Sequence, residues 1–178
     1  MIQINTDWNQ NLLPFAFYYT VEQVSDELIF SCSISSHKIC KTFDAFQLQN
    51  SFLFAEQLWK KEVIELFLKE EDSNTYFEFH IAPNKKWWAA EFSNYREMLR
   101  EREDIDISPS ILKENEGLHF SMRIPLSLLD ISDTNKLLYH VSAILEGDEK
   151  VYITSGQAHQ EKPDFHHEAL YRKCSIKR

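Results

Sequence analysis

Residues 58–68 read LWKKEVIELFL, and the alternation within this stretch sets the expected fold. Successive side chains of a β-strand point to opposite faces of a sheet, so Ile64, Leu66 and Leu68 share one face. Glu65 lies on the other face, between two apolar neighbours. We therefore predict a strand whose apolar face joins a core and whose opposite face carries one buried or solvated carboxylate.

A second stretch, YFEFHIA at residues 76–82, has the same alternation. Its apolar face carries two phenylalanines and an isoleucine, and its other face carries Glu78 and His80. If residues 69–75 (KEEDSNT) connect the two strands as a hairpin, Glu65, Glu78 and His80 lie on one sheet face within a few ångströms. The alternative is an ordinary wet face, since antiparallel sheets often expose one side to water.

Strand-like runs recur along the rest of the chain, separated by short turn signals such as EEDSN, KENEG and EGDEK. They are rich in aromatic and β-branched residues, and they occupy residues 15–24, 27–35, 87–93, 106–114, 118–125, 138–146 and 150–155. These intervals suit antiparallel neighbours better than βαβ crossovers. The sequence therefore predicts an all-β, antiparallel two-sheet β-sandwich, immunoglobulin-like or jelly-roll-like, as a single domain over residues 1–178.

Helix signals are confined to two short segments. Residues 93–104 (SNYREMLRERED) could form two or three turns with Ser93 or Asn94 as the N-cap, and residues 125–130 (PLSLLD) could form one turn after Pro125. Neither segment has a wide apolar stripe. We expect one or two short helices beside the sheets.

Composition narrows the classes of partner. The formal net charge is −9, which disfavours nucleic acid and anionic lipid as partners. The sequence shows no signal-peptide pattern and no run of about eighteen apolar residues, so we predict no membrane span and a cytoplasmic location. The three cysteines, Cys32, Cys40 and Cys174, show no C-x-x-C spacing and are expected to be free thiols.

Tryptophans flank the predicted polar patch. Trp59 precedes one strand, and Trp87 with Trp88 begins another. Because adjacent residues on a strand point to opposite faces, one member of that pair should join the core and the other should be partly exposed. Arg96 follows the same strand, where its guanidinium could reach a ligand or pair with Glu97 or Glu101.

Four quoted stretches together resemble the DOMON-like relatives of family 9 carbohydrate-binding modules. They are LW..EVIELFL, YFEFHIAPNKKWWAAEFSNYR, IPLSLL and KPDFHHEALY, and the resemblance covers about residues 59–171. It implies a β-sandwich that holds a sugar between aromatic rings while polar side chains bind its hydroxyl groups.

By position, the resemblance implies that Trp59 is one stacking wall and Glu65 a hydroxyl acceptor, with Glu78 and His80 on the neighbouring strand. The second wall falls at Phe165, where sugar-binding relatives have tryptophan. The set of expected ligand-binding residues is completed by Trp87, Arg96, His166 and His167.

Other functions fit parts of the same residue set. Glu65, Glu78, His80 and one of His166 or His167 could form a mixed N/O metal site, and the two glutamates could act as a glycosidase pair. Met98 and Met122 leave haem binding open, and a protein-interaction or small-molecule sensor domain of this fold is a further alternative. We predict a non-catalytic domain with no cofactor and no metal, which binds a carbohydrate or a similar small polar ligand.

Overall fold

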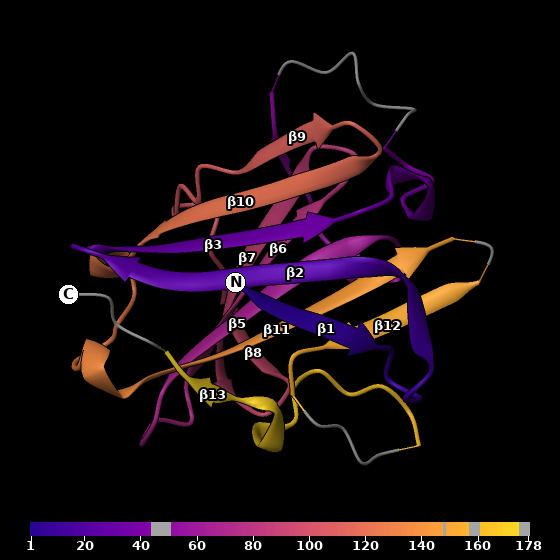
Figure 1. Cartoon of the computed structure of the whole chain (residues 1–178). Helices are drawn as coiled ribbons and strands as arrows, with labels where there is room; N and C mark the ends of the chain where they lie inside the picture. Colours follow the sequence, from indigo (N-terminus) through magenta and orange to yellow (C-terminus); the bar gives the residue numbers. More distant parts are fainter. Residues whose placement is uncertain (44–50, 148, 157–160, 175–178) are drawn as a thin grey trace.

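The computed structural model describes residues 1–43, 51–147, 149–156 and 161–174 and contains two β-sheets packed face to face (Figure 1). This confirms the predicted all-β sandwich. The five-stranded sheet has the order β1 (Ile2–Thr6), β2 (Leu12–Val24), β3 (Glu27–Ile34), β10 (Gly117–Pro125) and β9 (Ser110–Glu114).

The eight-stranded sheet contains the predicted polar patch. Its main path runs through β12 (Lys150–Thr154), β11 (Leu137–Glu146), β5 (Val63–Glu70), β6 (Tyr76–Ala82), β7 (Lys86–Asn94) and β4 (Leu53–Phe54). Strand β8 (Glu97–Glu101) pairs with β7, and β13 (Arg172–Lys173) pairs with β11. Only the contact of β4 with β7 is parallel among these pairings.

The two sheets differ in how their faces are covered. Strands β3 and β10 alternate between buried and partly exposed residues, as expected for a sheet with one face in the core and one toward water. Strands β5 and β6 are buried along nearly their whole length, so both of their faces are covered. The eight-stranded sheet therefore has a second, outer packing layer.

Each face of this sheet has its own apolar cluster. The core between the sheets contains Ile64, Leu66 and Leu68, as the alternation in residues 58–68 predicts. The outer cluster contains Val63 and Phe67 from β5, covered by side chains from segments outside the strands. These covering side chains are Trp8, Leu58, Phe165 and Leu170.

Helical structure in the described residues consists of three-residue 3-10 turns. They are η1 (His37–Ile39), η3 (Leu58–Lys60), η4 (Leu126–Leu128), η5 (Thr134–Lys136) and η6 (Glu168–Leu170). The predicted turn after Pro125 is confirmed as η4. No helix in the described part of the chain has the length and apolar character required to cross a bilayer.

The predicted helix over residues 93–104 is wrong, because this segment forms the β7–β8 hairpin. The chain reverses at Tyr95 and Arg96, and Arg96 takes a left-handed backbone conformation with φ of 57°. The hairpin gains cross-strand partners that an isolated helix without an apolar stripe lacks. Arg100 on β8, for example, pairs with Glu91 on β7 at 2.8 Å.

Candidate functional site

Strands β5 and β6 bring the predicted polar residues together. Their antiparallel register places Glu65 opposite His80 and Phe67 opposite Glu78, so the three polar side chains share the outer face of the sheet. The connection between the strands is residues 71–75, two residues shorter than the predicted 69–75, because Lys69 and Glu70 still belong to β5. All three are buried, with exposures of 2% for Glu65, 4% for Glu78 and 0% for His80. The alternative of a wet sheet face is therefore wrong.

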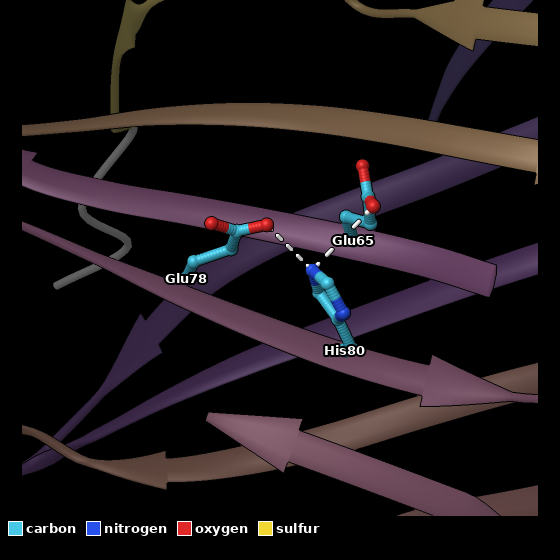
Figure 2. Close-up of side chains that lie close together, drawn as sticks. All are labelled: Glu65, Glu78 and His80. Carbon is cyan, nitrogen blue, oxygen red and sulfur yellow. Dashed lines mark hydrogen bonds and ion pairs between the residues drawn. The ribbon is translucent and has the colours of Figure 1, made fainter. Parts of the chain in front are cut away.

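The two carboxylates approach the same nitrogen of His80. Figure 2 shows Glu65 and Glu78 on either side of the imidazole, with Nε2 3.4 Å from Glu65 Oε1 and 2.6 Å from Glu78 Oε1. Ser142 on β11 donates its hydroxyl proton to Glu65 Oε2 at 2.5 Å. Because Nε2 carries at most one proton, a neutral His80 can donate a full hydrogen bond to only one of the two carboxylates.

Burial dominates the protonation of this cluster. Desolvation raises the pKa of Glu65 to about 7, an effect that nearby His80 opposes and Glu78 reinforces. Desolvation also raises the pKa of Glu78 to about 7, against the attraction of His166 and Arg96. The same desolvation lowers the pKa of His80 to about 4. At neutral pH, His80 is therefore uncharged, and the two carboxyl groups are near the midpoint of their titration.

Both glutamates line a cavity of about 380 Å³ on the outer face of the sheet. The walls are mainly aromatic, and the lining residues come from β5, β6, β7, β8, β11 and β12, from η3, from the β7–β8 turn and from residues 163–166. The lining rings are Trp59, Phe67, Trp88, Phe92, Tyr152 and Phe165. Arg96 and His166 add polar groups to the lining. The arrangement combines flat apolar surfaces with a small number of hydrogen-bonding groups, which is the usual composition of a small-molecule site.

Trp59 lies at one wall of the cavity, in η3 rather than in a strand, and 41% of its surface is exposed. Its ring centroid lies 5.4 Å from that of Trp88 and 6.1 Å from that of His80. The turn begins at Gln57, whose φ of 60° lies in the left-handed region, which is uncommon for residues other than glycine. The local backbone thus places Trp59 over the buried cluster while leaving part of its ring free.

Trp87, one of the expected ligand-binding residues, does not line the cavity and lies outside the candidate site. It pairs with Ile81, a residue of the core between the sheets, and it packs on that same inner face. Trp88 faces the cavity, is buried, and donates its indole N–H to Glu101 at 2.7 Å. Alternation along the strand predicts that Trp87 and Trp88 point to opposite faces of the sheet, but it does not predict which of the two lines the cavity.

Arg96 and the segment at residues 163–166 form one side of the cavity. The guanidinium of Arg96 pairs with Asp164 at 2.9 Å, rather than with Glu97 or Glu101. Tyr95 donates its hydroxyl proton to Asp164 at 2.5 Å, and His166 Nδ1 lies 2.7 Å from the hydroxyl oxygen of Tyr76. These contacts tie the C-terminal segment to the β7–β8 hairpin and the outer sheet face.

The two neighbouring histidines have different positions. His166 lines the cavity, whereas His167 is exposed and accepts a hydrogen bond from the backbone N–H of Ala169 at the start of η6. Phe165 lines the cavity and packs edge to face against Trp8, with ring centroids 5.6 Å apart. The structure therefore brings Phe165 and His166 into the candidate site and leaves His167 outside it.

Sequence reasoning missed several residues that shape the site. Asp164, Trp88 and Tyr152 were not selected, although the first lies within the quoted KPDFHHEALY stretch. Asp164 could have been noticed because it stands between Pro163 and Phe165 in that stretch. Tyr152 had no comparable signal, because its strand is short and ordinary in sequence.

The residues considered for a metal site lie close together, whereas those considered for haem binding do not all line the cavity. The donor atoms of Glu65, Glu78 and His80 lie within 4.8 Å of one another, so the cluster has the composition of a mixed N/O metal site. Met122 lies in the core between the sheets and is fully buried there, away from the cavity lining. Only Met98 of the two methionines considered for haem lines the cavity.

No family model and no curated protein matches this sequence. A solved structure with a similar fold is described as a "putative carbohydrate-binding protein" from Bacteroides uniformis ATCC 8492. The two folds align with a TM-score of 0.64 and 11% sequence identity, over 98% of this chain and 83% of that chain. At this identity, the likeness establishes a common fold.

Proposed function

We propose that the cavity on the outer face of the eight-stranded sheet binds a carbohydrate or a similar small polar ligand without chemical conversion. The observation that carries this proposal is the combination of aromatic walls with two buried carboxylates in a cavity of about 380 Å³. The resemblance to DOMON-like relatives of family 9 carbohydrate-binding modules and the fold of the Bacteroides protein support it.

The chemistry of a pyranose suits these walls. A sugar ring presents an apolar C–H face, which a flat aromatic ring such as Trp59 covers, and hydroxyl groups at its edge. Glu65 and Glu78 accept hydrogen bonds from those hydroxyls. Charge-assisted hydrogen bonds are the stronger class, and burial strengthens them further. After the cost of association we expect a Kd in the micromolar to millimolar range, roughly −4 to −8 kcal/mol.

A soluble glycan screen followed by calorimetry tests the proposal. We expect at least one oligosaccharide to bind and to change the tryptophan fluorescence, because Trp59 and Trp88 line the cavity. Trp59→Ala should weaken that binding by up to about 60-fold. Trp87→Phe is the matched control, since Trp87 lies on the inner face of the same sheet. Absence of binding by every oligosaccharide at millimolar concentration would contradict the proposal.

A further inference from the structure

The cavity has an imbalance of charge among the described residues. Glu65 and Glu78 both line it, and neither forms an ion pair or hydrogen bond with a lysine or arginine there. The guanidinium in the lining belongs to Arg96, and Asp164 already holds it at 2.9 Å. Two carboxyl groups thus face the cavity without a cation of their own. A buried carboxyl group either keeps its proton or pairs with a cation, because an unpaired buried charge is unfavourable.

His80 does not supply the missing charge. Its Nε2 faces both carboxylates, but its Nδ1 is buried and has no hydrogen-bond partner among the described residues. A positively charged imidazole carries protons on both nitrogens, and the Nδ1 proton would then lack an acceptor. His80 is therefore uncharged, and it contacts both carboxyl groups without neutralising their charge. A cation that pairs with them must come from the cavity.

The rings beside the carboxylates favour an organic cation. Trp59 and Trp88 both pack on His80, whose Nε2 contacts the two carboxyl groups, so two indole rings line the cavity together with Glu65 and Glu78. Tryptophan is the aromatic side chain that attracts ammonium groups most strongly. A carboxylate pair beside tryptophan rings is a recurring way to bind a protonated amine, because hydrogen bonds and cation–π attraction act together.

We propose that the ligand carries a protonated amine that donates hydrogen bonds to Glu65 and Glu78, which makes an amino sugar the class of carbohydrate bound. This inference rests on the proposed function and narrows it. The amine supplies the counterion that the cavity lacks, and the aromatic walls cover the apolar face of the same sugar ring.

A divalent metal ion is the competing cation, and the geometry favours the amine over it. A metal on Nε2 of His80 requires the proton to stay on Nδ1, where the described residues offer no acceptor. Histidine ligands almost always donate that second proton to a carboxylate, a carbonyl or water. His80 also does not line the cavity, whereas both glutamates do.

A matched series of β-1,4-linked oligosaccharides tests the inference by calorimetry. Its members carry an amine, an N-acetyl group or a hydroxyl at the same ring carbon, and are otherwise alike. At about pH 7, below the pKa of an α-amino group at about 7.7 to 8.0, most of the amine is protonated, and the two carboxyl groups are near the midpoint of their titration. We expect the amine member to bind at least about tenfold more tightly than both neutral members, the range of a charge-assisted hydrogen bond.

Two variants and a control locate the effect. Glu65→Gln and Glu78→Gln should each reduce the ratio of the affinity for the amine to that for the neutral members by about tenfold, in addition to any loss of hydroxyl hydrogen bonds that all members share. Glu97→Gln removes the same charge from an exposed position on β8 outside the cavity lining and should leave the preference unchanged. Circular dichroism checks that each variant is folded. The wild-type series remains decisive if a variant is not.

The outcomes separate this inference from the proposed function. If the neutral members bind as tightly as the amine, the amine inference is wrong and carbohydrate binding stands. If no member of the series and no glycan in the screen binds, the proposed function fails and the amine inference fails with it. Stoichiometric binding of Zn²⁺ alone, lost in both Glu65→Gln and Glu78→Gln, would assign the carboxylates to a metal and overturn the inference.

Discussion

Replacing Glu65 by glutamine should make the protein relatively more stable as pH rises. Burial raises the pKa of Glu65 from 4.5 to about 7 in the folded protein. Between these values the folded state keeps a proton that the unfolded chain has lost, so the contribution of Glu65 to stability falls as pH increases through this window. Glutamine cannot ionise and does not undergo this loss.

The size of the effect follows from the difference in pKa. A shift of 7 − 4.5 = 2.5 units corresponds to an upper limit of about 3.4 kcal/mol at about 1.36 kcal/mol per unit. Glu78 titrates in the same range and interacts with Glu65, so the pair shares the effect. We expect the free energy of unfolding of Glu65→Gln, minus that of the wild type, to increase by about 1 to 3 kcal/mol between about pH 4.5 and about pH 7.

Urea unfolding followed by circular dichroism at about pH 5, 6, 7 and 8 measures this difference. The depressed pKa of His80 has the opposite sign, since it adds stability as pH rises through about 4 to 6.5. The desolvation of His80 is present in both proteins and cancels in the difference, whereas loss of the attraction of Glu65 lowers the His80 pKa further in the variant. Glu97→Gln, at an exposed position, should give a difference independent of pH. A pH-independent difference for Glu65→Gln as well would refute the argument from burial.

Three further predictions concern Trp59 at the cavity wall, the buried ion pair of Arg102 with Glu91, and the three cysteines. Trp59 exposes 41% of a side chain of roughly 250 Å², which is about 100 Å² that a bound ligand can cover. Covering this area contributes about 2.5 kcal/mol to binding. Calorimetry should therefore show a loss of up to about 60-fold in affinity for Trp59→Ala. Arg102→Leu removes one of the two guanidinium partners of buried Glu91, at 3.0 Å, and leaves Arg100 at 2.8 Å, so it should lower the free energy of unfolding by about 2 kcal/mol in urea titrations, whereas an unchanged midpoint would contradict a structural role. Alkylation under denaturing conditions followed by mass spectrometry should modify all three free cysteines, and a missing site would indicate a disulfide.

The sequence predicts the architecture around β5 and β6 because alternation and pairing are local properties. The period of two assigns Ile64 and Leu66 to the inner core and Glu65 to the other face, and a short connection restricts the pairing to a hairpin. The proximity of Glu65 to His80 follows directly. The covering of this outer face does not, because it includes Phe165 and Trp8, which lie far away in the sequence.

The β7–β8 hairpin shows where local reasoning fails. Its turn, at Tyr95 and Arg96, lacks the Asn-Gly or Asp-Gly signature that usually marks a two-residue hairpin, and Arg96 adopts a positive φ without being glycine. The contacts that compensate are tertiary, because the backbone N–H of Arg96 donates to the hydroxyl of Tyr76 and its side chain pairs with Asp164. Because the sequence does not show these partners, a short charged segment that forms a hairpin cannot be told apart from one that forms a helix.

The outer layer that covers β5 and β6 has a consequence for the order in which the chain is synthesised. A ribosome releases residues 58–94 long before residues 163–171, so Phe67, Phe92 and their neighbours emerge without Phe165 and Leu170 to cover them. The nascent protein therefore presents an apolar sheet face for part of its synthesis. We expect chains truncated before residue 163 to associate with chaperones or to aggregate, even though both sheets contain most of their strands.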